Sequence, residues 1–446
     1  MSIRDYRHLL NNSASIFMLL VHGFMFGYVW FQFYVPVMKR YNLQFDRGDW
    51  AVIAMYMLLL FLISQYLGAS KIGYLRIADI CFSNLLALLI TNVIGYFQIV
   101  IAGRLYFDLV PYITMTITQM AFVIPWVMLI RSIYIRLYPP RDLVVIYGDY
   151  PPDNLIRKIN SRKERYNICE QISVYEDINA IYEKIRMFDA VVLCDLPVQL
   201  RNQILKHCYD RGIRTYITPK VSDIILGGTE QINLFDTPLL LSRNRGLTIE
   251  QRFFKRIVDV ILSVVTLLIA SPVMLVVALA IKLHDRGAVF YVQERTTRNG
   301  KTFRIYKFRS MKMNSESMWS DVNVDEDSRV TPVGRFIRKM HIDELPQIFN
   351  ILNGDMSWVG PRPEWNDLMS EYEKDIPEFS FRYKVKSGLT GYAQVYGKYN
   401  TTALDKLKLD LTYVENYTFW LDIKILLLTI KVLIQGDDTQ GKRSRR

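Results

Sequence analysis

The chain has 446 residues, of which 51% are hydrophobic and 22% are charged, and it carries a formal net charge of +12. That length suits about three domains, and a mean hydropathy of +0.10 predicts that part of the chain lies in a membrane. The positive charge fits nucleic acid, anionic lipid or phosphorylated substrates without choosing among them. Four cysteines without CxxC spacing or companion histidines argue against structural disulfides and a zinc site, so we expect the soluble parts to face a reducing compartment.

Four long apolar segments come first, and each has about the length of a bilayer-spanning helix, roughly 20 residues. They occupy residues 15–37, 50–67, 77–102 and 110–138. Aromatic residues near their ends, such as Trp30 and Tyr106, suit a membrane interface. We predict that residues 1–140 form a bundle of four transmembrane helices; the alternative is a set of buried core helices in a large soluble protein. Basic residues after the fourth segment place the N-terminus and the middle of the chain in the cytoplasm.

Residues 141–245 alternate short β-rich runs with helical stretches. This alternation predicts a small, Rossmann-like parallel α/β domain. The first strand leads into Gly148-Asp-Tyr-Pro-Pro, which lacks the GxGxxG spacing that lets a backbone approach a pyrophosphate. A structural or regulatory role is therefore favoured over cofactor binding.

A fifth apolar run, residues 257–283, lies in the segment 246–285 and is interrupted by Ser271 and Pro272. Proline lacks the amide proton and clashes with the preceding turn, so a bend is expected there. We predict a re-entrant membrane helix that breaks at Pro272 and returns to the same face. The alternatives are a kinked full span and a soluble core helix.

The last region, residues 286–446, reads as a soluble, mostly α domain that holds a pair of adjacent carboxylates, Asp343 and Glu344. The basic residues around this pair in the sequence are Arg335, Arg338, Lys339 and Arg362. Carboxylates among cations suit a site that holds a metal ion, grips a diphosphate and presents an anionic nucleophile to phosphorus. Pro346 ends a helix just after the acids, which favours a ligand site over a surface helix with ordinary charge pairs.

Two more cations, Lys307 and Arg309, alternate along a predicted strand and would share one face of it. Two cations on one face can converge on one anion. An ordinary exposed strand is the alternative.

From about residue 253 to 434 the chain resembles the bacterial sugar transferase family, the monotopic polyprenyl-phosphate phosphoglycosyl transferases. The motifs that carry the resemblance are Lys255-Arg-Ile-Val-Asp259, the Ser271-Pro272 break, Gln293-Glu-Arg295, Lys307-Phe-Arg-Ser-Met311, Asp343-Glu-Leu-Pro-Gln347, Gly354-Asp-Met-Ser357, Gly360-Pro-Arg-Pro-Glu364 and Gly388-Leu-Thr-Gly-Tyr-Ala-Gln-Val395. The whole chain is similar to the long-form members that start exopolysaccharide, capsule or O-antigen repeat units.

The resemblance implies transfer of a hexose 1-phosphate, glucose or galactose, from a UDP-sugar to undecaprenyl phosphate, with release of UMP. It implies that Asp343 is the nucleophile that forms an aspartyl-phosphosugar and that Glu344 ligates Mg²⁺. The residues implied in substrate binding are Gln293, Arg295, Lys307, Arg309, Arg338, Pro361 and Arg362. It also implies a multi-pass protein of the bacterial inner membrane with its catalytic domain in the cytoplasm. The expected partners are the two substrates and membrane lipid, with a second copy of the chain as a further candidate and no nucleic acid.

The chain departs from the family's usual pattern at Met340-His341, Thr297 and Ser387. These departures put the sugar specificity in doubt more than the reaction type. We expect His341 to be a surface residue of a helix. A catalytically silent membrane scaffold for glycan-assembly proteins is the main competing hypothesis; a transporter is disfavoured because the first four segments hold few charges besides Asp79.

Overall fold

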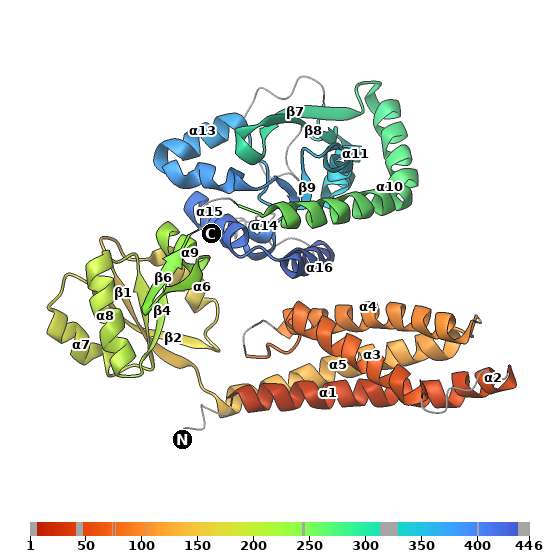
Figure 1. Ribbon diagram of the computed structural model, residues 1–446, viewed down its shortest axis with the longest axis horizontal. Helices are drawn as coiled ribbons and strands as arrows, with labels where there is room; N and C mark the ends of the chain where they lie inside the picture. Colours follow the sequence, from red (N-terminus) through yellow and green to blue (C-terminus); the bar gives the residue numbers. More distant parts are fainter. Residues whose placement is uncertain are drawn as a thin grey trace. The chain divides into compact units, whose positions relative to one another are not determined.

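The computed structural model describes residues 7–41, 48–73, 75, 77–104, 106–242, 246–312, 329–398 and 401–435. The chain divides into two compact units, Met1–Thr218 and Pro219–Arg446, which are described separately below. Helices predominate in the described residues, and the sheets are small (Figure 1).

The first unit opens with long apolar helices that run alongside one another (Figure 1). They are α1 (Arg7–Val29), which continues through a π-helical turn (Trp30–Tyr34) into α2 (Val35–Arg40), then α3 (Gly48–Leu67), α4 (Ile77–Gly103) and α5 (Val110–Leu137). Contacts join α1 to α3 and α5, and α4 to α3 and α5. Among the described residues, five helices are long and apolar enough to cross a membrane: these four and α10 of the second unit. Large apolar side chains such as Phe24 and Ile101 point outward, which calls for an apolar surrounding.

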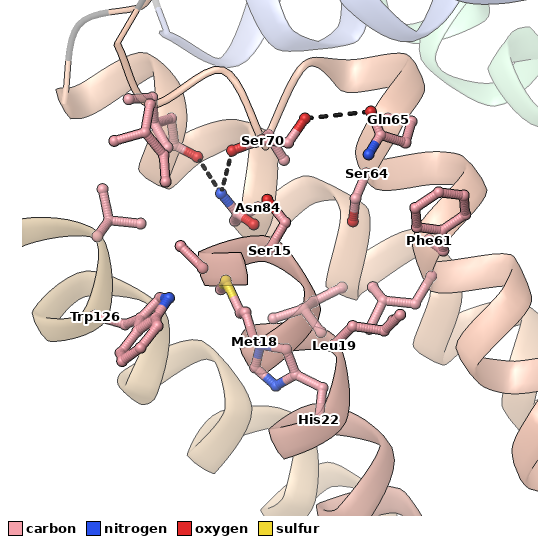
Figure 2. Close-up of a pocket in the computed structure, with 17 residues that line it drawn as sticks. Ser15, Met18, Leu19, His22, Phe61, Ser64, Gln65, Ser70, Asn84 and Trp126 are labelled. Atoms are coloured by element: carbon pink, nitrogen blue, oxygen red, sulfur yellow. Dashed lines mark hydrogen bonds between the residues drawn. The ribbon is translucent and has the colours of Figure 1, made fainter. Parts of the chain in front are cut away.

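A pocket with a mostly apolar lining and a few polar side chains lies between α1, α3, α4 and α5 (Figure 2). Its lining side chains include Ser15, His22, Gln65 and Asn84, and none of the lining residues is charged. Asn84 donates hydrogen bonds to the carbonyls of Ile80 (2.8 Å) and, more weakly, Ala69 (3.3 Å). The pocket therefore offers no cation that would hold a phosphate, so the phosphate chemistry suggested by the sequence has to be sought in the second unit.

A four-stranded parallel sheet, ordered β2-β1-β3-β4, completes the first unit. Its elements are β1 (Arg141–Tyr147), α6 (Asp153–Asn160), β2 (Tyr166–Ser173), α7 (Ile178–Ile185), β3 (Ala190–Cys194), α8 (Val198–Asp210) and β4 (Arg214–Ile217). A Cβ at Gly148 would lie 2.3 Å from the carbonyl oxygen of Asp195. This close approach explains why a glycine follows β1, because a side chain there would collide with the backbone that follows β3.

The second unit begins with α9 (Val221–Gly227) and a hairpin of β5 (Glu230–Leu234) and β6 (Thr237–Leu241). The elements that follow are α10 (Ile249–Asp285), β7 (Phe290–Thr296), η3 (Arg298–Gly300), β8 (Thr302–Phe308), α11 (Pro332–Lys339), η4 (Ile342–Glu344), α12 (Gln347–Asn353), β9 (Ser357–Val359), α13 (Asn366–Asp375), η5 (Pro377–Lys384), β10 (Gly388–Thr390), α14 (Tyr392–Tyr396), α15 (Ala403–Glu415) and α16 (Phe419–Gln435). Strands β7 and β8 pair antiparallel, and β9 and β10 pair parallel. Separate apolar clusters bind these pieces into one body, such as Ile224 of α9 with Leu407 and Leu411 of α15.

Helix α10 is continuous in its hydrogen bonding over 37 residues, yet its ribbon turns a sharp corner (Figure 1). Pro272 is the proline inside the helix, and sharp helix kinks almost always lie at such residues. Ser271 and Pro272 are both exposed, and the Ser271 hydroxyl donates to the Leu268 carbonyl at 3.1 Å. The helix is therefore bent, as the sequence predicts, and we assign the bend to Pro272.

Both arms of α10 pack on the same body. In the first arm, Lys255 pairs with Asp422 of α16 at 2.5 Å, and Asp259 accepts from the backbone nitrogen of Trp358 at 3.0 Å. In the second arm, Met274, Val277 and Ile281 pack against Phe308 of β8 and Ile337 of α11. The two arms of α10 thus contact the domain that holds the carboxylate pair at separate places, an arrangement that we call the clasp.

Candidate active site

The carboxylate pair lies on a short 3₁₀ turn, η4, between two α-helices. Helix α11 ends at Lys339, and His341 takes a left-handed conformation with φ of 55°. His341 is therefore not on the surface of a helix, as we expected; it is the residue at which the chain turns. Left-handed backbone is uncommon for a residue with a side chain and is found at functional turns. Because of this turn, Asp343 and Glu344 lie outside both flanking α-helices.

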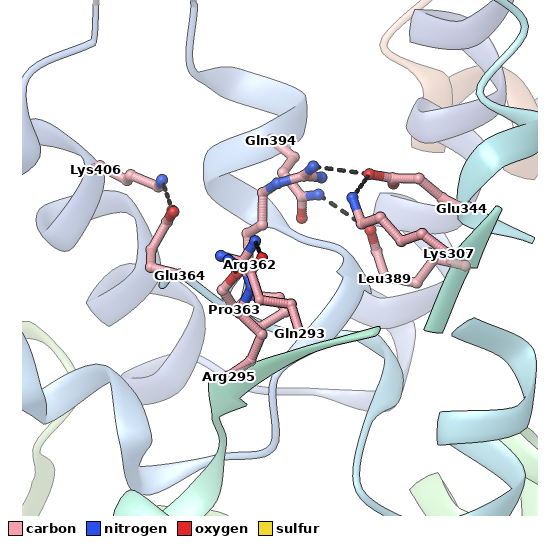
Figure 3. A network of polar contacts seen from close by, with 10 residues as sticks. All are labelled: Gln293, Arg295, Lys307, Glu344, Arg362, Pro363, Glu364, Leu389, Gln394 and Lys406. Carbon is pink, nitrogen blue, oxygen red and sulfur yellow. Dashed lines mark hydrogen bonds and ion pairs between the residues drawn. The ribbon is translucent and has the colours of Figure 1, made fainter. Parts of the chain in front are cut away.

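Two cations from separate elements meet at Glu344 (Figure 3). The Lys307 ammonium of β8 lies 2.7 Å from its Oε1, and the Arg362 guanidinium lies 2.8 Å from the same oxygen. The Glu344 side chain is only 16% exposed. Charge-assisted hydrogen bonds of this kind are the strong ones, and both use one oxygen, which leaves Oε2 for another ligand.

The two carboxylates differ in their acidity. Burial would raise the pKa of Glu344, but Arg362 and Lys307 outweigh burial and hold that pKa well below its usual range. Burial and the neighbouring Glu344 charge raise the pKa of Asp343, against the opposing effects of Lys307 and Arg338. Burial lowers the pKa of Lys307, while Glu344 raises that of Arg362. Glu344 therefore stays ionised, and Asp343 is the more basic of the two carboxylates.

The loop that carries Arg362 is held by buried guanidinium groups. Arg382 donates to the carbonyl of Arg362 at 2.9 Å and pairs with Asp410 at 2.7 Å, and both of these side chains are 1% exposed. Arg295 donates to the carbonyl of Pro363 at 3.3 Å and to Gln293 at 2.7 Å. Pro361 and Pro363 flank Arg362 and restrict its backbone. The loop is thus fixed along its length.

The predicted site residues fall into two groups. The acid pair, Lys307 and Arg362 are brought together, and Arg338 lies close enough for its charge to lower the pKa of Asp343. Arg295 donates to the backbone of the loop at Pro363, and the Gln293 side chain accepts from Arg295. Arg309 is buried and pairs with Asp285 at the end of α10, so the structure does not bring it to the acid pair. Sequence reasoning missed Arg382, whose role depends on a distant backbone carbonyl.

The second unit thus holds a mostly buried carboxylate site among cations, in a domain that packs against a bent apolar helix. Residues 250–436 match the model of the bacterial sugar transferase family. The N-acetylgalactosaminephosphotransferase of Aeromonas hydrophila that uses UDP-N-acetylgalactosamine and undecaprenyl phosphate is 32% identical over 350 residues, 75% of this chain and 77% of the relative. The chain therefore belongs to the bacterial sugar transferase family, as its motifs predict.

Two other curated relatives act on different sugars by name. The UDP-glucose:undecaprenyl-phosphate glucose-1-phosphate transferase of Klebsiella pneumoniae is 36% identical over 264 residues, 57% of this chain and 54% of that protein. The undecaprenyl-phosphate galactose phosphotransferase of Salmonella typhimurium is 37% identical over 255 residues, 53% of this chain and 52% of that protein. The matched region thus spans about half the length of these two relatives. Family membership and the apolar helices make this chain a membrane protein.

Proposed function

We propose that this protein transfers a hexose 1-phosphate from a UDP-sugar to undecaprenyl phosphate and releases UMP. The observation that carries the proposal is the arrangement around Glu344, where Lys307 and Arg362 converge beside a second, more basic carboxylate, Asp343. A cationic surround supports binding of a diphosphate, and a carboxylate set among cations can attack phosphorus.

In the first step an oxygen of Asp343 forms a bond to the sugar-linked phosphorus. The bond from that phosphorus to the bridging oxygen breaks, and UMP leaves with the electron pair. Lys307 and Arg362 are positioned on the neighbouring Glu344, where their charges stabilise the negative charge that develops on the phosphoryl oxygens. In the second step an oxygen of undecaprenyl phosphate bonds to the same phosphorus, and the bond to Asp343 breaks, which restores the carboxylate.

The site suits a magnesium ion that is coordinated partly by the protein and partly by the substrate. Among the described residues no group of three or more His, Cys, Asp and Glu side chains gathers as a metal site. Mg²⁺ is commonly held by one or two carboxylates together with substrate phosphates and water. Glu344, through its Oε2, is the residue that we assign to hold it. When bound, the ion would neutralise charge on the diphosphate.

We propose that the site lies at the cytoplasmic face of the bacterial inner membrane. In this arrangement α10 is a re-entrant helix and the four N-terminal helices cross the membrane. A straight helix of 37 residues would be about 55 Å long, well beyond the roughly 30 Å of a hydrocarbon core. It would carry its two ends to opposite sides of the bilayer. Contacts of both arms with one domain support a return to the same side.

The reaction is tested by UMP release from purified full-length protein with Mg²⁺, undecaprenyl phosphate and a panel of UDP-sugars. We expect release with one or a few sugars and none with Asp343→Asn, because the amide cannot form the acyl phosphate. Circular dichroism and membrane extraction check that the variant is folded and inserted. Lys374→Gln, an exposed lysine on α13, is the control. Near-wild-type release from Asp343→Asn would remove Asp343 as nucleophile; no release from any sugar would favour the scaffold hypothesis.

A further inference from the structure

A second group of basic side chains lies at the C-terminal end of α12. It is built from motifs that the proposed reaction does not use: Lys255-Arg256, Gly354-Asp355 and Lys386-Ser387. Gly354 has a φ of +88°, and a Cβ there would lie 3.5 Å from the Lys386 ammonium and 3.7 Å from the Arg256 guanidinium. Two cations from distant parts of the sequence therefore flank one glycine.

Neighbouring contacts fix the position of this group. Arg256 donates to the last carbonyls of α12, at 2.5 Å to Ile351 and 2.6 Å to Leu352. The Thr297 hydroxyl donates to the Asp355 carbonyl at 2.9 Å and accepts from the backbone nitrogen of Ser387 at 3.1 Å. Arg298, which follows Thr297, is thereby held beside Lys386, and its charge acts on it.

Positive charge exceeds negative charge in this group. The cations are Arg256, Arg298, Lys301 and Lys386, and the carboxylates whose charges oppose them are Asp259 and Asp355. Asp259 is already engaged by the Ser357 hydroxyl and the Trp358 nitrogen, each at 3.0 Å. In the described part of the chain, the Lys386 ammonium and the Arg298 guanidinium make no side-chain hydrogen bond or ion pair. Burial and the two arginines lower the pKa of Lys386, and they outweigh the opposing charges of Asp259 and Asp355, as expected for a partly buried cation among like charges.

We propose that Arg256, Arg298 and Lys386 form a second phosphate-binding site, and that an anionic phospholipid headgroup supplies the phosphate. The site is separate from the acid pair, because α12 lies between them and its seven residues span about 10 Å. Arg256 lies on the first arm of α10, flanked by the outward-facing Phe253 (62% exposed) and Ile257 (40% exposed). A cation cluster next to an apolar face is the arrangement that binds a lipid headgroup with its acyl chains alongside.

The inference rests on the membrane seat proposed for α10 but not on the reaction. Full-length protein is reconstituted in nanodiscs of phosphatidylcholine and phosphatidylglycerol, and the lipids retained after detergent exchange are counted by native mass spectrometry. We expect enrichment of phosphatidylglycerol on the wild-type protein and a roughly thirtyfold loss of it in Arg298→Gln/Lys386→Gln, since two cation contacts of about 1 kcal/mol each are lost. Lys386→Arg keeps the charge and should keep the enrichment.

The matched control is Lys206→Gln/Lys374→Gln, which removes two exposed charges elsewhere. A second arm measures binding of inorganic pyrophosphate in pure phosphatidylcholine nanodiscs. Unchanged lipid retention with weaker pyrophosphate binding in the double variant supports the site and assigns a soluble phosphate as its source. Equal retention of both probes by the double variant and the wild type overturns the proposal. UMP release measured on the same samples tells this failure apart from a failure of the proposed reaction.

Discussion

Two adjacent acids of similar chemistry behave differently because of where their neighbours lie. Glu344 receives both Lys307 and Arg362 on one oxygen, whereas Asp343 receives the unfavourable charge of Glu344. Pairs of titratable groups whose pKa values are pushed apart mark the division of roles in many active sites. The same division supports Asp343 as the attacking group.

The raised pKa of Asp343 gives a prediction for the pH dependence of the first step. The attacking carboxylate must be ionised, so single-turnover UMP release should fall as the pH drops through the raised pKa. That limb should lie above the ordinary aspartate value of about 3.9. Glu344, whose pKa is lowered, stays ionised over the same range. A rapid-quench pH series on the wild-type protein measures the limb, and a limb at or below the ordinary aspartate value would contradict the assignment.

At the level of elements, the loop after β9 positions Arg362 at Glu344, and the hydrogen bond from Arg382 to the Arg362 carbonyl fixes the backbone of this loop. Arg382→Lys loses the planar fork that reaches both the Arg362 carbonyl and Asp410. We expect kcat for UMP release to fall roughly tenfold with little change in KM, since the effect acts through positioning. Arg304→Lys, at an exposed arginine of β8, is the control.

A purely structural role for Arg382 would lower stability without regard to Arg362. In an Arg362→Ala background, therefore, Arg382→Lys should cause little further loss of rate. If the two substitutions reduce the rate of UMP release independently, so that the double variant loses the product of the two single factors at equal folded fraction, the positioning role is refuted.

The bend in α10 can be tested directly. Pro272→Ala restores an amide hydrogen and removes the ring clash, so we expect the two arms to open and activity to fall. Spin labels at the exposed positions Val265 and Leu279 report the distance between the arms by pulsed EPR. Ser271→Ala is the control. An unchanged distance distribution would show that packing of the arms, and not proline, sets the bend.

Local patterns in the sequence predict the helices and strands better than they predict which distant residues these elements contact. The apolar lengths, the βα alternation and the Pro272 bend depend on neighbouring residues, and each has a counterpart in the structure. Arg309 shows the limit: strand β8 ends at Phe308, so the alternation that would align Arg309 with Lys307 stops there, and Arg309 meets Asp285. Arg382 gives no spacing signal at all, because its partner is a carbonyl twenty residues away.

At the scale of the molecule, the site and all its supports belong to the second unit, which has its own apolar clusters. Helix α9 belongs to this unit through Ile224, which packs on Leu407 and Leu411. A fragment from residue 219 should therefore be more stable than one from residue 229 by roughly 2 kcal/mol, the value of one buried isoleucine. Denaturant unfolding of both fragments in the same detergent measures the difference. UMP release by both would place the activity in this unit, and equal stability would contradict the role of α9.

The clasp of α10 on its domain has a consequence for how the protein is made. The first arm obtains Trp358 and Asp422 as partners, 99 and 167 residues further along the chain. When α10 leaves the ribosome, it is a helix apolar enough to cross a membrane, and it has none of the contacts that keep its arms together. Nearly the whole domain is translated before both arms can make these contacts. If α10 is re-entrant, as proposed above, chaperones or the insertion machinery have to keep this helix from crossing the membrane during that period.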